Sequence, residues 1–253
     1  MQQDYALELI EKGKRVDGRK LDDYRPIKIE KGIIKNAEGS TSIKLGETEI
    51  IAGVKIGMGT PFADTPNEGT LMVNAEFTPL ASPDFESGPP GENAVELARL
   101  VDRGLRESKS IDLEKLVIKE GEKVLTVFVD IHIINHQGNL IDAAALAAIT
   151  ALHNTKIPVV EDEKLIRGKY KGELPVKYKP VEVTVCKVGT NLILDPLFEE
   201  ESIIDCKLTI AVRDDDKICA MQKQGKGVLT IDEIEKMIDL AIKKSKELRK
   251  LVV

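Results

Sequence analysis

The sequence predicts an α/β protein of two lobes, in which mixed β-sheets pack against helices. In each half, strand-like alternation of apolar and polar residues is followed by a long helical pattern. The chain has 253 residues, enough for two modest domains that each have a core. We divide it into an N-terminal helix and arm at 1–26, a first lobe at 27–165, a connection at 166–184 and a C-terminal lobe at 185–253.

The first lobe is predicted from three stretches in which apolar and polar residues alternate. These strand-like stretches are residues 27–58, 70–80 and 115–134. A proline-rich loop follows the second stretch and leads into an amphipathic helix at 91–108. The alanine-rich stretch 140–153 is apolar on all sides, so we expect a largely buried helix there.

The remaining elements lie at the two ends of the chain. A short helix is expected at 4–12, followed by a basic arm. Four strands are predicted in the second half, at 181–189, 191–196, 206–214 and 218–225. A final helix should begin at Ile231, because Thr230 and Glu233 have the spacing of a capping box. The basic, proline-containing segment before the four strands is interpreted as the connection between the lobes.

The helix at 91–108 carries a row of arginines. At 100° per residue, its small and apolar side chains fall on one arc, and Arg99, Arg103 and Arg106 fall on the opposite one. Planar guanidinium groups suit phosphate, so a single-stranded nucleic acid backbone is one candidate ligand. The alternative is a solvated helix face with salt bridges, which the helix pattern taken alone favours.

The composition argues against several classes of protein. A formal net charge of −6 does not suit a protein that coats nucleic acid, so any anion site must be a local basic patch. The 3 cysteines have no paired spacing, and His132 and His136 lie in a strand-like stretch without neighbouring ligands. We therefore expect no disulfide framework, no metal and no cofactor. No segment resembles a signal core or a membrane span, which predicts a cytoplasmic protein.

Carboxylates are concentrated between two of the predicted strands of the second half. They are Asp195, Glu199, Glu200, Glu201 and Asp205. A solvated acidic loop is one interpretation. The other is a carboxylate cluster for general acid chemistry, or one that holds a divalent ion near a phosphate.

Four segments, in this order and spacing, together resemble the RNase PH family of phosphorolytic 3′-to-5′ exoribonucleases. They are RVDGR at 15–19 with YRP at 24–26, then residues 36–54, 96–108 and 193–210. The resemblance extends from about residue 15 to about residue 250. It implies the RNase PH fold, with two βαβ-type lobes assembled into a ring around a central channel. Inorganic phosphate would cleave RNA in that channel and release nucleoside diphosphates.

The sequence departs from this family at the positions that would bind phosphate. The resemblance implies an arginine where Asn93 stands and a second where Leu140 stands, with Asp142 adding negative charge beside it. Of an expected aspartate pair, Asp205 matches one member and Glu199 replaces the other. Phosphorolysis brings two anions together, so cationic donors must offset their repulsion. We therefore expect a degenerate site and no catalytic residue in this chain.

These departures resemble the non-catalytic RNase-PH-like subunits of archaeal exosomes. The resemblance implies a trimer of heterodimers with a catalytic RNase-PH-like exosome subunit, cap subunits with OB-fold or KH-type domains, and single-stranded RNA. Arg99 and Arg103 would contact RNA phosphates beside the partner's active site, with Arg106 a weaker third. Two alternatives stay open: an active phosphorolytic exoribonuclease that uses Glu199 and Asp205, and a purely structural ring subunit.

Overall fold

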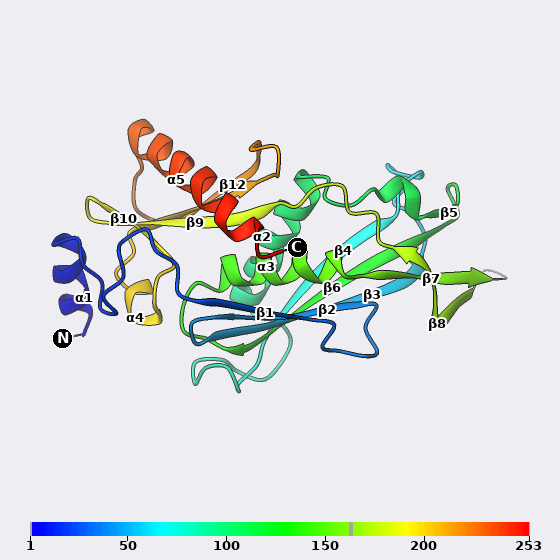
Figure 1. Ribbon diagram of the computed structural model, residues 1–253, viewed down its shortest axis with the longest axis horizontal. Coiled ribbons are helices and arrows are strands. Elements are labelled where there is room, and N and C mark those ends of the chain that lie inside the picture. The colour runs from blue at the N-terminus through cyan, green and yellow to red at the C-terminus, as the bar shows by residue number, and fades with distance from the viewer. Residues whose placement is uncertain (1, 162–163, 253) are drawn as a thin grey trace.

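The computed structural model describes residues 2–161 and 164–252 and contains two main β-sheets (Figure 1). The strands of the larger sheet are β1 (Ile27–Lys31), β2 (Gly39–Leu45), β3 (Thr48–Gly59), β4 (Thr70–Phe77), β5 (Val117–Lys119) and β6 (Lys123–Asn135). Their order is β1-β2-β3-β6-β4, and β5 pairs with β6. Strands β4 and β6 are parallel and are connected through helix α2 (Glu92–Glu107) and the short 3₁₀ helix η1 (Leu113–Leu116). This part of the lobe is therefore a βαβ crossover.

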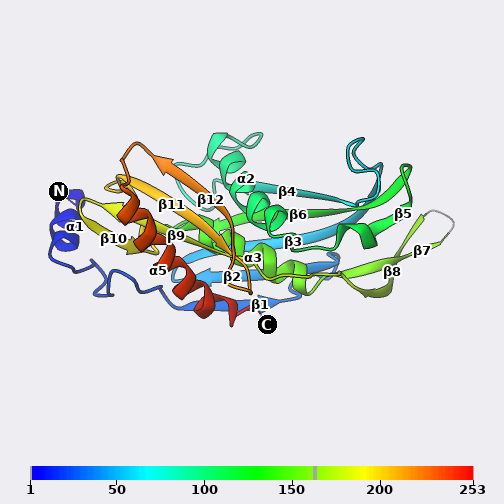
Figure 2. The same cartoon turned by 90° about the horizontal axis from the view of Figure 1, so that it is seen from above.

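The smaller sheet is formed by the C-terminal part of the chain. Its strands are β9 (Val181–Val188), β10 (Asn191–Leu194), β11 (Cys206–Val212) and β12 (Ile218–Gly225), and their order is β10-β9-β11-β12. Each pair in this sheet is antiparallel. Helix α5 (Ile231–Arg249) packs on β9 and β11 and crosses the strands in Figure 2. The short helices α1 (Gln2–Glu11) and α4 (Phe198–Glu201) contact each other at one end of the molecule.

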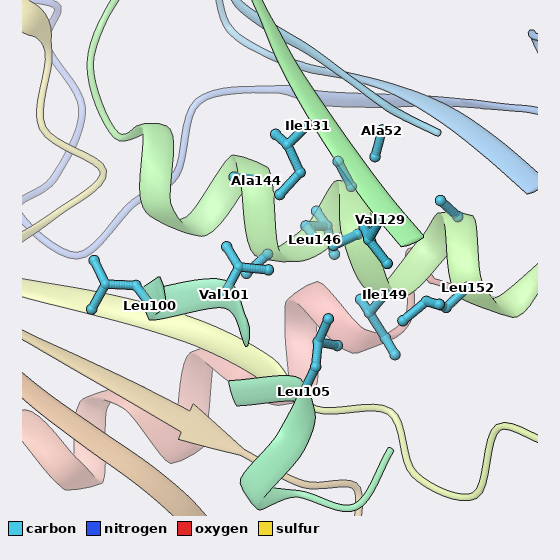
Figure 3. Packing of buried hydrophobic residues seen from close by; sticks show 14 of the residues in the cluster. Ala52, Leu100, Val101, Leu105, Val129, Ile131, Ala144, Leu146, Ile149 and Leu152 are labelled. Atoms are coloured by element: carbon cyan, nitrogen blue, oxygen red, sulfur yellow. The ribbon is translucent and has the colours of Figure 1, made fainter. Parts of the chain in front are cut away.

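Helix α3 (Leu140–His153) lies between the two sheets. It packs against β2 and β3 of the larger sheet and against β9 of the smaller one. Its residues from 141 to 152 are all buried, and its many alanines let both sheets approach closely. Figure 3 shows Val129 of β6 on one side of α3 and Leu105 of α2 on the other. One hydrophobic cluster extends through both sheets, so the two halves share a continuous core.

The structure confirms the predicted α/β class and the main helices. The expected helix at 140–153 has these bounds in the structure, and the buried face of α2 contains the small and apolar residues of the predicted arc. The capping box of α5 is also present: the Thr230 amide donates to Glu233 Oε2 at 2.8 Å, and the Glu233 amide donates to Thr230 Oγ1 at 3.3 Å. Hydrophobic period and capping chemistry were sufficient for these elements.

The segment at 166–184, which the sequence predicts as a connection, includes most of a strand at 164–173 and the start of β9. Strands β7 (Lys156–Glu161) and β8 (Lys164–Glu173) form a hairpin that projects from the end of the molecule opposite α1 (Figures 1 and 2). The register shifts on both sides of Pro158, because proline cannot donate to a strand ladder. The predicted segments include residues 1, 162, 163 and 253, which lie outside the described residues.

The division of the chain into an N-terminal arm, two lobes and a connection between them stays a prediction.

One buried carboxyl group lies beneath α2 without a hydrogen-bond partner. Glu182 of β9 is 3% exposed, and its Oε2 accepts no hydrogen bond within the described residues. Its side chain occupies the space beside Gly104 of α2, where an added Cβ would be 1.9 Å from Oε1. Burial, followed by the charge of Asp142, raises the pKa of Glu182 well above its ordinary value. The fold therefore favours the protonated carboxyl group.

Replacing Glu182 with leucine should stabilise the protein. Removing a buried carboxyl group that lacks a partner should raise the free energy of unfolding by about 1–3 kcal/mol near neutral pH. The pKa of Glu182 is higher in the folded wild type than its unfolded value of 4.5. The contribution of this group to stability is therefore fully present below pH 4.5 and is lost as the pH rises through the folded pKa. The advantage of Glu182→Leu over wild type should therefore grow with pH.

Urea denaturation at about pH 5 and about pH 8 measures this difference. The control is Glu235→Leu, at an exposed position of α5, for which we expect a small change that is similar at both pH values. A Glu182→Leu variant that unfolds more easily than wild type at both pH values would show that the carboxyl group stabilises the fold.

Candidate functional site

The arginine row of α2 points away from the core. Arg99, Arg103 and Arg106 are all exposed. Arg106 is nevertheless held in place: it donates to Asp102 from Nε at 3.0 Å and from Nη2 at 2.6 Å, and to the Leu71 carbonyl oxygen at 3.0 Å. In the part of the chain that the structure describes, Arg99 and Arg103 form no hydrogen bond or ion pair. The row therefore offers two free guanidinium groups and one that already has partners.

The two free arginines line a groove of about 590 Å³ between α2 and β12. Lys223 of β12 also lines this groove and adds a third cation, with its Nζ donating to the Gly225 carbonyl oxygen at 2.9 Å. Val95 and Leu100 of α2 supply apolar surface, and Glu92 and Glu96 also line the groove, so three cations face two carboxylates there. The excess of cations and the apolar walls suit a nucleic acid strand, which has charged phosphates and flat apolar bases. Sequence reasoning missed Lys223, because only the fold brings β12 beside α2.

The two positions implied for phosphate-binding arginines hold no cation. Asn93 is exposed in the first turn of α2 and lines a hollow of about 620 Å³. Among the described residues that line this hollow there is no lysine or arginine, and three are acidic: Glu76, Asp84 and Glu86. Leu140 is the first residue of α3 and packs against the core. A phosphate in the hollow would be repelled by its carboxylates.

The arginines of the N-terminal arm already have buried partners. Arg15 donates to Glu200 from Nε at 2.7 Å and also from Nη2, and both side chains are fully buried. Arg25 donates to Asp195 from its backbone amide at 2.7 Å, from Nε at 2.9 Å and from Nη2 at 2.6 Å. Arg19 Nη1 also donates to Asp195, at 2.9 Å. These three guanidinium groups hold the fold together and are not free to bind phosphate.

The acidic stretch does not form one carboxylate cluster. Two of its members are the buried partners just described. Glu199 is exposed on α4, where it accepts from Gln137 Nε2 at 3.3 Å. Asp205 precedes β11 and accepts from the Gly189 amide at 2.7 Å. Gly189 lies before β10 and Gln137 lies before α3, so Glu199 and Asp205 accept from different parts of the fold.

Asp142 is buried rather than exposed to a ligand. It accepts from the Tyr24 hydroxyl at 2.6 Å, from Asn139 Nδ2 at 3.2 Å and from the Thr184 amide at 2.8 Å. Burial raises the pKa of Asp142 to about 6, and the three hydrogen bonds act in the opposite direction. Its carboxyl group therefore joins the N-terminal arm, the start of α3 and β9.

The cysteines, the possible metal ligands and the helices were the remaining features of the sequence. Cys186 and Cys206 are buried and Cys219 is half-buried, and all three are free thiols. Within residues 2–161 and 164–252 no three His, Cys, Asp or Glu side chains are grouped as metal ligands. None of the described helices combines the length and the apolar character needed to cross a bilayer.

Family comparison agrees with the fold. A sequence model described as 3′ exoribonuclease family, domain 1, matches residues 23–158, and domain 2 of the same family matches 179–244. The chain belongs to the RNase PH family. A relative in Thermococcus gammatolerans, named exosome complex component Rrp42, is 46% identical over 99% of this chain and 93% of its own length. A protein of the same name in Methanocella arvoryzae is 49% identical over 98% of this chain and 94% of its own length.

Solved structures show the same fold. A chain of the Archaeoglobus fulgidus exosome with RNA bound to the active site superposes with a TM-score of 0.92 at 47% identity, over 98% of this chain and 96% of that one. A chain of an archaeal exosome core gives 0.88 at 44% identity, over 99% and 96%. Rice Rrp46, at 18% identity, gives 0.71 over 94% and 98% and shows the fold alone. The predicted RNase PH fold is confirmed.

The buried arginine–carboxylate network should be required for stability. Asp195→Asn should lower the free energy of unfolding by about 3–5 kcal/mol, because Arg19 and Arg25 would lose their buried counter-charge. Asp195 has a positive φ of 47°, which asparagine also tolerates, so backbone strain would not contribute. Chemical denaturation measures the loss. The control is the exposed Asp215→Asn, which should lower the free energy of unfolding far less, because exposed ion pairs contribute little. An equal loss in both variants would contradict the assigned role of Asp195.

Proposed function

We propose that this chain is a ring subunit of an archaeal exosome that binds RNA and carries out no chemistry itself. The observation that carries the proposal is the groove between α2 and β12, where Arg99 and Arg103 are exposed and without partners. The relatives named exosome complex component Rrp42, and the solved exosome that has RNA in its active site, support membership of such a ring. In this proposal, a catalytic RNase-PH-like subunit alternates with this chain as a trimer of heterodimers.

The groove would act by positioning the RNA strand. Guanidinium groups at Arg99 and Arg103 would bind successive phosphates, with Lys223 on the opposite wall as a further cation. Contacts of this kind carry no sequence information, which suits an enzyme complex that degrades RNA of any sequence. A strand held along α2 would present its 3′ end to the partner's active site in a fixed orientation. Arg106 would contribute less, because Asp102 already neutralises it.

An active enzyme is the first alternative, and the charges of the chain argue against it. Inorganic phosphate would have to approach an RNA phosphate in the hollow beside Asn93, whose described lining includes acidic side chains and no lysine or arginine. The arginines of the arm cannot take over, since Arg15, Arg19 and Arg25 are bound to buried carboxylates. Without cations at this place, the repulsion between the two reactants would raise the barrier.

A purely structural role is the second alternative. Arg99 and Arg103 would then form salt bridges with the neighbouring subunit and would not contact RNA. The proposal also includes a cytoplasmic location and cap subunits with OB-fold or KH-type domains, both implied by the sequence resemblance. The two roles of the arginines differ in what a charge reversal would change: RNA binding in one case and ring assembly in the other.

The double variant Arg99→Glu with Arg103→Glu separates these roles. RNA affinity and the rate of RNA decay by the assembled complex should fall, while size-exclusion chromatography should still show an intact ring. Each lost phosphate contact should flatten the dependence of binding on salt by about 0.7–1 unit of logarithmic slope. The matched control is Lys236→Glu with Lys250→Glu, two exposed positions at α5 and its C-terminal end.

Each outcome of this experiment corresponds to a different role of the two arginines. Equal RNA affinity and decay rate in wild type and the arginine variant would rule out RNA contact at the groove. A ring that dissociates would assign the arginines to the subunit interface. A loss as large in the lysine control would mean that overall charge, rather than the groove, governs binding.

A further inference from the structure

The β7–β8 hairpin is a separate feature that the groove does not explain. The two family domains match residues 23–158 and 179–244, so all of β8 lies in the unmatched interval between them. The hairpin is a two-stranded sheet that pairs with neither main sheet, and it projects from the end of the molecule opposite α1 (Figures 1 and 2). Its side chains are mostly exposed along β8.

The second strand of the hairpin is basic. Between residues 164 and 179 there are six lysines and arginines and a single acidic residue, Glu173, whereas the sequence directly before them, at 161–163, consists of three acidic residues. On β8, Lys169 and Lys171 are exposed, and within the described residues neither forms a hydrogen bond or an ion pair. Uncompensated positive charge is therefore concentrated on this strand.

The irregular part of β8 is tied to the residue that precedes β2. Arg167 Nη1 donates to Glu38 at 2.9 Å, and Lys55 Nζ of β3 lies 2.8 Å from the same carboxylate. The Glu38 side chain is 4% exposed, so one nearly buried carboxylate serves two cations and leaves a surplus of positive charge. Tyr170 pairs with Pro158 and Ile166 pairs with Val159, which leaves residues 167–169 as a bulge. Lys169 therefore lies in a bulge of β8 that the ion pair between Arg167 and Glu38 anchors.

The hairpin edges are poorly suited to a docking β-strand. Pro158 in β7 lacks a backbone N–H, and Gly168 in β8 has a φ of +80°, which interrupts a regular strand. Lysines along an edge strand also oppose pairing with another chain. An anionic polymer needs no strand ladder and binds to side-chain charge alone. The chemistry of the hairpin therefore favours a polyanion over an extended peptide.

We propose that Lys169 and Lys171 form a second RNA-contact surface, which binds phosphates outside the groove between α2 and β12. The two residues lie two positions apart in the irregular part of β8, where the pairing with β7 skips both of them, and both side chains are exposed. Such contacts would be independent of RNA sequence and sensitive to salt. The hairpin would hold RNA that extends beyond the groove, and this role does not require that the groove itself binds RNA.

The test uses the full chain and compares Lys169→Gln with Lys171→Gln, as a double variant, with wild type. The probes are two labelled oligoadenylates. One site can hold the shorter probe, of about 6 nucleotides, whereas the longer probe, of about 30 nucleotides, extends beyond one site. Affinity for the long RNA, measured by fluorescence anisotropy, should fall several-fold, with a salt slope flatter by about 1.4 units for two lost contacts. Affinity for the short RNA should not change.

Two further variants keep the result interpretable. Lys236→Gln with Lys250→Gln removes the same charge elsewhere and should leave both affinities unchanged. Arg99→Glu with Arg103→Glu should weaken the binding of both RNAs if the groove binds RNA. Weaker binding of the long RNA by the hairpin variant would support the hairpin surface even if the groove variant bound both RNAs like wild type.

Four results would overturn the proposal. An unchanged affinity and salt slope for the long RNA would mean that the lysines only protect the strand edge. An equal loss in the lysine control would point to overall charge. If polyglutamate displaced the long RNA from wild type and from the hairpin variant equally well, the hairpin would not be where RNA binds. If polyglutamate bound to the hairpin and RNA did not, the partner of the hairpin would be an acidic protein.

Discussion

The buried carboxylate of Asp195 is the interaction on which the two halves of the protein depend. Its two oxygens accept hydrogen bonds from Arg25, Arg19 and Asn139, which come from the N-terminal arm and the start of α3. A carboxylate with no solvent exposure must be compensated in this way, and removing any partner would leave a buried charge. The network therefore fixes the arm, α3 and the end of β10 relative to one another.

The position of α2 follows from this shared core and determines what the protein can bind. Its apolar face packs against α3 and β4, and Gly104 lets Glu182 lie directly beneath the helix. The opposite face must then be exposed, which leaves Arg99 and Arg103 beside β12. The charges of the two hollows differ: three cations and two carboxylates line the groove, while the hollow beside Asn93 is lined by three carboxylates and, among the described residues, by no lysine or arginine. This difference is the basis for the proposal that the chain binds an anionic strand and leaves the chemistry to a partner.

Local patterns were sufficient to predict the helices and the arginine row, because a period of 3.6 residues separates the two faces of α2 without reference to the rest of the fold. They were insufficient where partners lie far apart in sequence. Asp195, Glu199 and Glu200 belong to one acidic stretch and cannot be told apart by a local pattern. Asp195 and Glu200 are buried beside arm arginines some 170 to 185 positions away, whereas Glu199 is exposed. Lys223 joins the groove only through the packing of β12 against α2. The hairpin at β7 and β8 was missed because bulges around Pro158 interrupt the alternation that marks strands.

The central claim is that this subunit binds RNA and leaves the chemistry to a partner. The most direct measurement is phosphate-dependent release of nucleoside diphosphates from a short single-stranded RNA, first with the purified chain alone and then after mixing with a catalytic RNase-PH-like subunit. The account predicts no release by the chain alone and release by the mixture that exceeds that of the catalytic subunit by itself. Release by the chain alone would contradict it, because phosphate would then be bound productively at a site that lacks both expected arginines.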